Sequence, residues 1–375
     1  VYQNHAFIVA DNVGAHGMQV FNLTRLRSVV SPPENFTADT VLTAGWNGSE
    51  IRSCHNIVIN ETKGMAYLVG CSSANGGGPM FIDITDPINP VAVGEYTAEG
   101  YTHDAQVVTY NGPDTTHLGK ELMIASNANK VVIIDVSTPT SPIKISEVSY
   151  NNTAYTHQGW FSSDMNYFLV GDEQDEQGYG GNTRTIVFDF TDLDNPVYHS
   201  DFTGNSSAID HNLYVKDNLV FEANYTSGLR VYDISDINNI SEVGYFDTHP
   251  ENNNTTFYGA WSVYPYFNSG NIIVSDIDRG LFILRKSGFP LSVDNSVFNE
   301  KQVSVYPNPA SEKLTVSTKD EHIKQLYVYN ALGQKVIDFE FNNFNEVTLD
   351  VSYLSNGVYF LKINDDYAQK ILIEK

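Results

Sequence analysis

The stretch Lys130-Val131-Val132-Ile133-Ile134-Asp135-Val136-Ser137 decides the fold of this chain, because similar stretches recur along it. Each copy is a short apolar run closed by a polar residue, most often Asp. The closing residues are Asn22, Asp83, Asp135, Asp189, Asp233 and Arg285, which are 61, 52, 54, 44 and 52 residues apart. A period of about 50 residues with several strands in each repeat is typical of a β-propeller.

Four strands are expected in each repeat. The innermost begins near a His, as at Thr156-His157-Gln158, and the second is an apolar run such as Tyr167-Phe168-Leu169-Val170. The third is the Asp-bearing strand, and a turn with Pro and Asp leads to an outer strand. Six repeats predict six blades over residues 1–286. The first is cut short at Val1 and the last stops after its third strand, so we expect seven blades in the complete protein.

The repeat pattern ends at Lys286. Residues 287–300 are expected to be a linker, and residues 301–375 contain short strands with alternating polarity, such as Lys313-Leu314-Thr315-Val316. A segment of this size and pattern predicts a small β-sandwich. The fold class expected for the chain is therefore all-β, with a β-propeller followed by a small β-sandwich.

The chain is strongly acidic, with 21 Lys and Arg against 45 Asp and Glu, and a net charge of −24. Nucleic acids and anionic lipid surfaces would repel such a surface, so the charge argues against both as partners. Apolar runs such as 131–134 are far too short to span a membrane, and no transmembrane segment is expected. The charge suits either simple solubility or cation binding.

Two cysteines, Cys54 and Cys71, flank a predicted hairpin. If Asn60 pairs with Met65, the paired residue numbers add up to 125, as do 54 and 71, so the cysteines face each other. Their Cα atoms would then lie about 4.4–6.8 Å apart. A disulfide would fit an oxidising compartment, and a reduced, packed pair is the alternative.

The tail carries motifs that are specific as a set. They are Val305-Tyr306-Pro307-Asn308-Pro309, Asn330-Ala331-Leu332-Gly333-Gln334-Lys335, Leu354-Ser355-Asn356-Gly357-Val358-Tyr359 and the closing 370–375. On these motifs, residues 301–375 resemble the C-terminal sorting domain of the type IX secretion system of Bacteroidetes. The resemblance implies that the secretion machinery recognises residues 301–375, and that the protein is extracellular or held at the outer cell surface.

The propeller part carries its own motifs at the starts of the innermost strands. They include Ser53-Cys54-His55-Asn56-Ile57, Tyr101-Thr102-His103-Asp104-Ala105, Tyr155-Thr156-His157-Gln158-Gly159 and Asp210-His211-Asn212-Leu213-Tyr214. Residues 1–286 resemble the choice-of-anchor B family, whose repeats are similar to LVIVD repeats. The resemblance implies a common propeller body with varied C-terminal anchors, and it carries over no catalytic residues.

The recurring His is the sharpest chemical feature of the repeats. His55, His103, His157 and His211 open the innermost strands of successive repeats, and Trp261 takes that place in the last. Equivalent positions in a radial array fall on one circle, so these side chains are expected around one rim of the central channel. They are the candidate ligand-binding residues.

Carboxylates are expected at the same rim, because each second strand runs antiparallel to the first. They are Asp172, Glu173 and Asp276. Together with the four His side chains they are candidate ligands for a divalent metal, zinc or calcium. The nearby carboxylates are expected to keep the imidazoles protonated to higher pH. In the alternative hypothesis, each His bonds the backbone of a neighbouring blade and simply locks the ring.

A second acidic segment is Gly171-Asp172-Glu173-Gln174-Asp175-Glu176-Gln177-Gly178. Its side chains could bind calcium through oxygen ligands, but they lack the spacing of an EF-hand loop. A solvated acidic loop is the favoured interpretation, with Arg184 available to pair with one of the acids.

Two functions are consistent with these features. The leading hypothesis is a non-enzymatic, secreted or surface-held propeller that binds a protein, glycan or small ligand at its His-lined face. The rival is a metal-dependent hydrolase or lyase that uses the same rim. A bound metal with an open coordination position would favour the enzyme, and a mutually hydrogen-bonded His ring would favour a scaffold.

Overall fold

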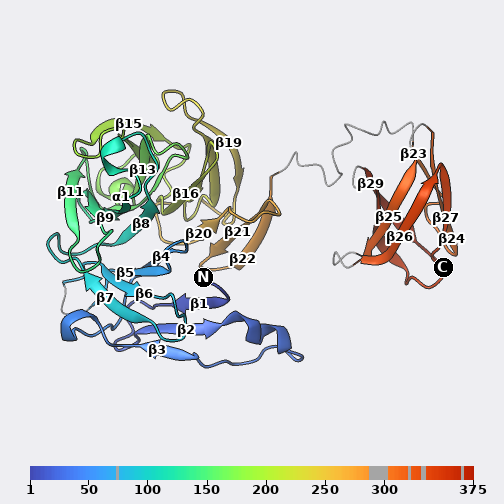
Figure 1. The fold of residues 1–375 in the computed structure, drawn as a ribbon. Helices are drawn as coiled ribbons and strands as arrows, with labels where there is room; N and C mark the ends of the chain where they lie inside the picture. The colour runs from blue at the N-terminus through green and yellow to red at the C-terminus, as the bar shows by residue number, and fades with distance from the viewer. Residues whose placement is uncertain (73–75, 287–302, 320–321, 331–334, 365–366) are drawn as a thin grey trace. The chain divides into compact units, whose positions relative to one another are not determined.

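The computed structural model describes residues 1–72, 76–286, 303–319, 322–330, 335–364 and 367–375. They form two compact units, Val1–Leu284 and Arg285–Lys375 (Figure 1). The linker expected at 287–300 lies outside the described residues, as do residues 331–334 of one tail motif. No described helix is long and apolar enough to cross a membrane.

The first unit consists of six antiparallel sheets that follow one another along the chain, which we call blades 1 to 6. The innermost strands are β4 (Asn56–Asn60), β8 (Asp104–Thr109), β12 (Thr156–Phe161), β16 (Asn212–Lys216) and β20 (Ala260–Tyr264). The second strands are β1 (His5–Ile8), β5 (Met65–Val69), β9 (Glu121–Ser126), β13 (Tyr167–Asp172), β17 (Leu219–Ala223) and β21 (Asn271–Asp276). Blades 2 to 5 have four strands each, and blades 1 and 6 have three.

The third and outer strands complete the blades. The third strands are β2 (Met18–Asn22), β6 (Met80–Asp83), β10 (Val131–Asp135), β14 (Arg184–Asp189), β18 (Leu229–Asp233) and β22 (Gly280–Arg285). The outer strands are β3 (Thr40–Leu42), β7 (Val91–Glu95), β11 (Ile143–Val148), β15 (Val197–Thr203) and β19 (Ser241–Phe246). Innermost strands of successive blades from β4 to β20 contact one another, and Figure 1 shows the sheets arranged around a common centre.

The apolar core lies between the blades. Between blades 3 and 4, for example, Leu122 and Ile133 pack in one cluster with Phe168 and Phe188, and all four are fully buried. In blades 2 to 4, the second and third strands are covered on both faces by neighbouring sheets, which explains why their sequences are nearly continuous apolar runs. The outer strand β11, in contrast, has no fully buried residue.

The second unit is a small sandwich of two sheets. One sheet has the order β23 (Val303–Tyr306), β24 (Lys313–Thr318) and β27 (Glu346–Asp350). The other has the order β26 (Lys335–Phe344), β25 (Ile323–Asn330), β28 (Gly357–Ile363) and β29 (Tyr367–Ile373). One apolar cluster holds residues from both sheets, including Leu314, Leu326 and Leu361. The predicted fold class, a β-propeller followed by a small β-sandwich, is confirmed.

Helical structure in the described residues is confined to loops. The 3-10 helices are η1 (Leu23–Ser28), η2 (Trp46–Gly48) and η3 (Thr115–His117), and the one short α-helix is α1 (Asp175–Gly178). The prediction of a solvated acidic loop at 171–178 is wrong, because Asp175 and Glu176 of α1 are each only 5% exposed. Arg184 does pair with an acid there, since its Nε lies 2.8 Å from Asp175 Oδ2.

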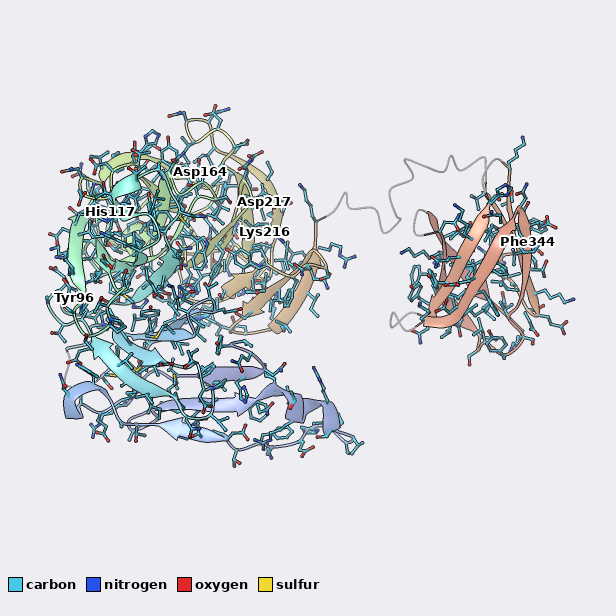
Figure 2. All side chains as sticks on the ribbon, in the orientation of Figure 1. Tyr96, His117, Asp164, Lys216, Asp217 and Phe344 are labelled. Carbon is cyan, nitrogen blue, oxygen red and sulfur yellow. A yellow bond between two sulfur atoms is a disulfide. The ribbon has the colours of Figure 1, made fainter. Side chains whose placement is uncertain are left out.

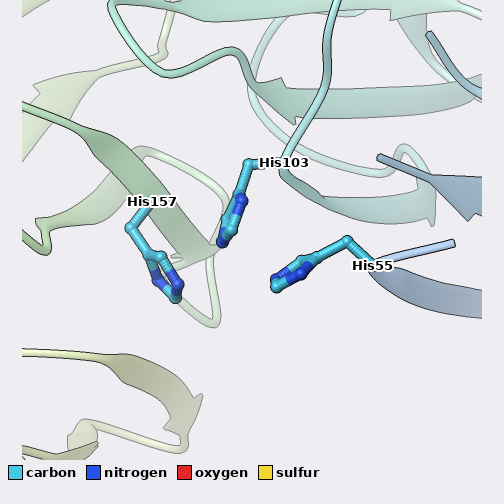
Figure 3. Close-up of side chains that lie close together, drawn as sticks. All are labelled: His55, His103 and His157. Carbon is cyan, nitrogen blue, oxygen red and sulfur yellow. The ribbon is translucent and has the colours of Figure 1, made fainter. Parts of the chain in front are cut away.

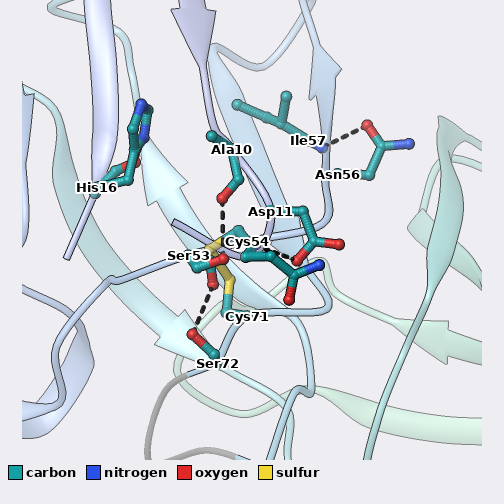
Figure 4. The surroundings of a disulfide bond; sticks show 11 residues. Ala10, Asp11, His16, Ser53, Cys54, Asn56, Ile57, Cys71 and Ser72 are labelled. Carbon is teal, nitrogen blue, oxygen red and sulfur yellow. Dashed lines mark hydrogen bonds between the residues drawn. A yellow bond between two sulfur atoms is a disulfide. The ribbon is translucent and has the colours of Figure 1, made fainter. Parts of the chain in front are cut away.

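A disulfide joins Cys54 and Cys71 beyond the end of the β4–β5 ladder (Figure 4). Asn60 pairs with Met65, as the residue numbers predicted. The Cα atoms of the cysteines are 3.8 Å apart, so the expected range of 4.4–6.8 Å is wrong. The Cys54 N–H donates to Ala10 O rather than to Cys71, and residues paired without hydrogen bonds bring their Cα atoms closer together.

The disulfide should contribute measurably to stability. It closes a loop with a sequence separation of 17, for which chain entropy predicts about 3 kcal/mol. A Cys54→Ala, Cys71→Ala variant should therefore lose about that much free energy of unfolding in urea denaturation. Reductant should lower the parent to the level of the variant and leave the variant unchanged. Identical unfolding midpoints for parent and variant would contradict the expectation.

Candidate functional site

A β-bulge at the start of an innermost strand orients two of the predicted site residues. In β12, Thr156 pairs with Asp172 and Gln158 pairs with Gly171, so His157 has no partner in the ladder. Trp261 has the same place in β20, between paired residues 260 and 262. A bulge bends the strand locally and redirects the side chain of the extra residue.

The same local arrangement recurs in blades 2 and 3. The His55 N–H donates to Val69 O, although Val69 is the ladder partner of Asn56. In the same way, the His103 N–H donates to the carbonyl of residue 126, which pairs with Asp104. Each of these His residues therefore immediately precedes the first paired residue of its strand, and its N–H bonds to the carbonyl of that residue's ladder partner.

The structure brings the four predicted His side chains together in a continuous row, which we call the histidine row. Its members are His55, His103, His157 and His211. Successive ring centroids are 3.9, 4.4 and 4.3 Å apart, and the Trp261 ring lies 4.5 Å beyond His211. Figure 3 shows the first three rings facing one another from separate blades. Ligand atoms of His55, His103 and His157 all lie within 4.8 Å of one another.

Polar partners hold the first half of the row. His55 Nδ1 lies 3.1 Å from Asp11 Oδ2 at the end of the neighbouring blade. His103 Nδ1 lies 2.9 Å from the Tyr155 hydroxyl and 3.2 Å from the Tyr101 hydroxyl. The buried Nε2 of His103 has no hydrogen-bond partner among the described residues. One nitrogen of this ring is therefore oriented by tyrosines and the other is unused.

Glu173 joins the second half of the row. Its Oε1 lies 3.5 Å from His211 Nε2, and its Oε2 lies 3.8 Å from His157 Nε2. The Tyr225 hydroxyl donates to the same carboxylate over 2.6 Å. Ligand atoms in a tetrahedral zinc site with bonds of about 2.0–2.1 Å lie about 3.4 Å apart. The separations between Glu173 and the two imidazoles are close to this value.

The protonation of His211 follows from its other contact. His211 Nδ1 lies 2.5 Å from the carbonyl oxygen of Trp261, and the Asn212 amide nitrogen, 2.9 Å from Nδ1, donates to the same carbonyl over 3.0 Å. A carbonyl only accepts, so Nδ1 carries the proton of the neutral ring and Nε2 carries the lone pair. That lone pair faces the Glu173 carboxylate, an arrangement that is repulsive until a cation or a proton lies between them.

Burial keeps three members of the row neutral. It lowers the pKa of His103 and of His211 to about 3, and that of His157 well below its usual range. Burial also raises the pKa of Glu173. The expectation that nearby carboxylates would raise the imidazole pKa is thus wrong for these three rings, because desolvation outweighs the attraction of the carboxylate.

Two predicted metal ligands do not join the row. The Asp172 carboxylate accepts from the Tyr150 hydroxyl and from the backbone N–H groups of residues 154 and 155, so it orders a loop. Asp276 Oδ1 accepts from the backbone N–H groups of residues 278 and 279. Neither belongs to a group of three potential ligands among the described residues.

Sequence reasoning missed Tyr225 and Asp210. Tyr225 follows β17 at a φ of 34° and positions Glu173, which no local pattern signals. Asp210 precedes His211 and lies within 4.8 Å of Asp175 and Glu176. A signal existed for Asp210, because the equivalent residues of blades 2, 3 and 4 are Cys54, Thr102 and Thr156, none of them acidic.

Two other features of the propeller involve His117, Asp164 and Asp217, which Figure 2 labels. Asp114, His117 and Asp194 form a further group of potential ligands. The ammonium group of Lys120 lies 3.1 Å from His117 Nδ1 and already supplies a positive charge there. A pocket lined by Asp164 and Asp217 lies in the turns at the opposite ends of β12 and β16.

Family models match a segment in each part of the chain. Residues 304–374 match the secretion system C-terminal sorting domain, and residues 119–150 match the LVIVD repeat. The tail is a C-terminal sorting domain of the type IX secretion system. The propeller, which carries an LVIVD repeat, is therefore exported, and the protein is extracellular or at the outer cell surface. The predicted interaction of the sorting domain with the secretion machinery follows from the same match.

Solved structures share the fold at low sequence identity. A periplasmic gluconolactonase of Pseudomonas aeruginosa is similar with a TM-score of 0.55 and 10% identity, covering 98% of each chain. A protein from Lactobacillus plantarum is similar with a TM-score of 0.55 and 13% identity, covering 92% of this chain and 99% of that chain. At these identities the likeness shows the fold alone.

A curated relative shares a short segment. An endo-acting ulvan lyase of Formosa agariphila is 30% identical over 88 residues, which are 22% of this chain. The chain spans 17% of the length of that lyase. The likeness thus concerns a small part of both proteins.

Neutral His103 should make the parent sensitive to acid. Its folded-state pKa of about 3 lies below the ordinary value of 6.5, so between these pH values the unfolded chain binds a proton that the folded protein does not. The free energy of unfolding is therefore unaffected by this group above pH 6.5 and decreases as the pH falls from 6.5 toward 3. Relative to a His103→Gln variant, the parent should lose up to about 1.4 kcal/mol per pH unit below 6.5. Urea denaturation in metal-free buffer at pH 7.5, 5.5 and 4.5 measures this difference. A parallel decline in both proteins would show that His103 is charged in the folded state.

The sorting domain should be dispensable for folding of the propeller. A chain that lacks residues 301–375 keeps every inter-blade cluster, so its melting temperature for the propeller should match that of the parent. In a host with the type IX machinery, the truncated protein should remain in the cell envelope while the parent reaches the medium or the surface. Fractionation of cells and medium checks this, and normal export of the truncated protein would contradict the address role.

Proposed function

We propose that the propeller is an exported binding protein whose histidine row holds a divalent transition-metal ion, zinc in the first instance. The proposed ligands are Nε2 of His157, Nε2 of His211 and the Glu173 carboxylate. Three protein ligands would leave a fourth position of the metal open to a protein, glycan or small ligand at this face.

The observation that carries the proposal is the lone pair of His211 directed at a carboxylate. The Trp261 carbonyl fixes the proton on Nδ1, and Glu173 Oε1 lies 3.5 Å from Nε2. A metal-bound His commonly donates its other ring N–H to a backbone carbonyl, which sets its tautomer and orientation. His211 has this second contact already in place.

The surroundings support the proposed ligands. Tyr225 donates to Glu173 and so orients the carboxylate toward both imidazoles. His157 is 2% exposed and His211 is 3% exposed, so the packing around them holds both imidazoles in place. Because burial keeps both rings neutral, their lone pairs are available without loss of a proton.

Exposed aromatic rings lie beside the end of the row and offer a surface for a further ligand. Trp261 and Phe257 are each 42% exposed, and their rings lie 5.9 and 5.3 Å from that of Tyr225. Aromatic faces with polar groups nearby suit sugars and other partly apolar ligands. A glycan or peptide could therefore contact these rings and the open position of the metal together.

The sharpest test uses Glu173→Gln. In metal-free protein, the amide can donate to the lone pair of His211, so removal of the repulsive charge should raise the melting temperature. The same change should weaken zinc binding at least 10-fold, because a charged ligand is lost. Thermal unfolding with and without zinc, and isothermal titration at pH 7.5, measure the two effects in the full chain.

Two further variants complete the test. His157→Ala, His211→Ala should abolish zinc binding, and His199→Ala, outside the row, should keep the one-to-one stoichiometry of the parent. The ligand role would be overturned by a parent that binds no zinc and a Glu173→Gln variant that melts lower. In that case the row is a structural lock between blades.

A further inference from the structure

Three carboxyl groups meet next to the histidine row and form a group that we call the acid triad. They are Asp175 and Glu176 of α1 and Asp210, the residue before His211. Their potential ligand oxygens all lie within 4.8 Å of one another. The three residues are 5%, 5% and 3% exposed. Such burial of three acids is costly unless their charges are neutralised.

Donors within the described residues leave most of the triad unsatisfied. Arg184 Nε lies 2.8 Å from Asp175 Oδ2. In contrast, Asp175 Oδ1, Asp210 Oδ1 and both carboxylate oxygens of Glu176 are buried without a hydrogen-bond partner. A carboxylate with neither oxygen satisfied is unusual at this depth, since buried polar groups are nearly always paired.

Two neighbouring acids show what a satisfied buried carboxylate looks like in this protein. Asp172 is fully buried and accepts from the Tyr150 hydroxyl and two backbone N–H groups. Glu222 is 1% exposed and accepts from Thr185 Oγ1 and Asn224 Nδ2. The fold therefore supplies donors to these two buried acids, whereas four oxygens of the triad have none among the described residues.

We infer that Asp175, Glu176 and Asp210 bind one hard divalent cation, for which calcium is the natural probe. Three carboxylates and the Arg184 guanidinium carry a net charge of −2, which one such cation neutralises. Calcium and magnesium take oxygen ligands from carboxylates, and calcium accepts irregular geometry. This site uses oxygen ligands only and is distinct from the nitrogen-rich site proposed in the histidine row.

A bound proton is the competing explanation. Burial and the charge of Asp172 raise the pKa of Asp175 to about 6, and burial and the charge of Asp175 raise the pKa of Glu176 to about 9. Burial and the charges of the other two acids hold the pKa of Asp210 well above its usual range, so shared protons could also neutralise the triad. The two explanations differ in one measurable respect. A cation site responds to added calcium at constant pH, and a protonated pair does not.

The test uses the full chain, freed of metal with a chelator and dialysed at pH 7.5. Calcium at 100 times its dissociation constant should raise the melting temperature of the propeller by roughly 5 °C. Isothermal titration should give one calcium per chain. Glu176→Gln and Asp210→Asn keep side-chain size but remove charge, and each should abolish the shift while the protein stays folded.

Two controls separate this site from general charge effects and from the histidine row. Glu34→Gln removes an exposed carboxylate and should keep the full calcium response. Glu173→Gln, which alters the proposed zinc site, should also keep it. A parent whose melting temperature and heat of titration do not respond to calcium would overturn the inference and leave the shared proton as the explanation. A response that survives in Glu176→Gln would overturn it as well.

Discussion

Burial of apolar strands between neighbouring blades is the constraint on which the rest of the propeller depends. Each cluster joins two sheets, so every blade needs its neighbour to bury the second and third strands. The sheets must then follow one another around a centre, with equivalent residues at equivalent places. Because the innermost strands run in the same sense in every blade, the residues that open them meet at one end. The histidine row is a direct consequence of this geometry.

The site concentrates polar groups in a fold whose interior is otherwise apolar. His103, His157 and His211 are neutral because burial disfavours their charged forms, and Glu173 faces the lone pair of His211. Such an arrangement carries a cost in the free energy of folding that a simple structural lock would not require. A lock needs one hydrogen bond per His to the next blade, as His211 makes to Trp261. The unused Nε2 of His103 and the opposed lone pair of His211 go beyond that need.

Repeats made most of the fold predictable from the sequence. The spacing of the Asp-bearing strands predicted the blades. The register of the β4–β5 hairpin, in which Asn60 pairs with Met65, was predicted because paired residue numbers have a constant sum in an antiparallel ladder. The position of the four His side chains followed from their equivalence. What failed depended on contacts between loops of different blades. The burial of α1 leaves no periodic signal, and Asp210 is visible only as a departure from the residues at equivalent positions. The direction of the imidazole pKa required the depth of burial, which sequence does not provide.

In blades 2 to 4, the residue before each His links the start of an innermost strand to the end of the second strand, and the kind of link differs between blades. In blade 2 this residue is Cys54, and a disulfide ties it to the segment after the second strand. In blade 3, Thr102 donates to Asn127 over 2.8 Å, and in blade 4, Thr156 pairs with Asp172. All three connections hold the start of an innermost strand against the end of the second, which fixes the His that follows. A disulfide can serve there because the protein is exported to a compartment in which disulfides persist.

Blade 5 departs from this pattern, because Asp210 turns a carboxylate toward α1 instead, and no donor meets its Oδ1 within the described part of the chain. If a cation bridges Asp210 to Asp175 and Glu176, it joins the start of β16 in blade 5 to the segment after β13 in blade 4, and it holds His211 and Glu173 from the same two segments.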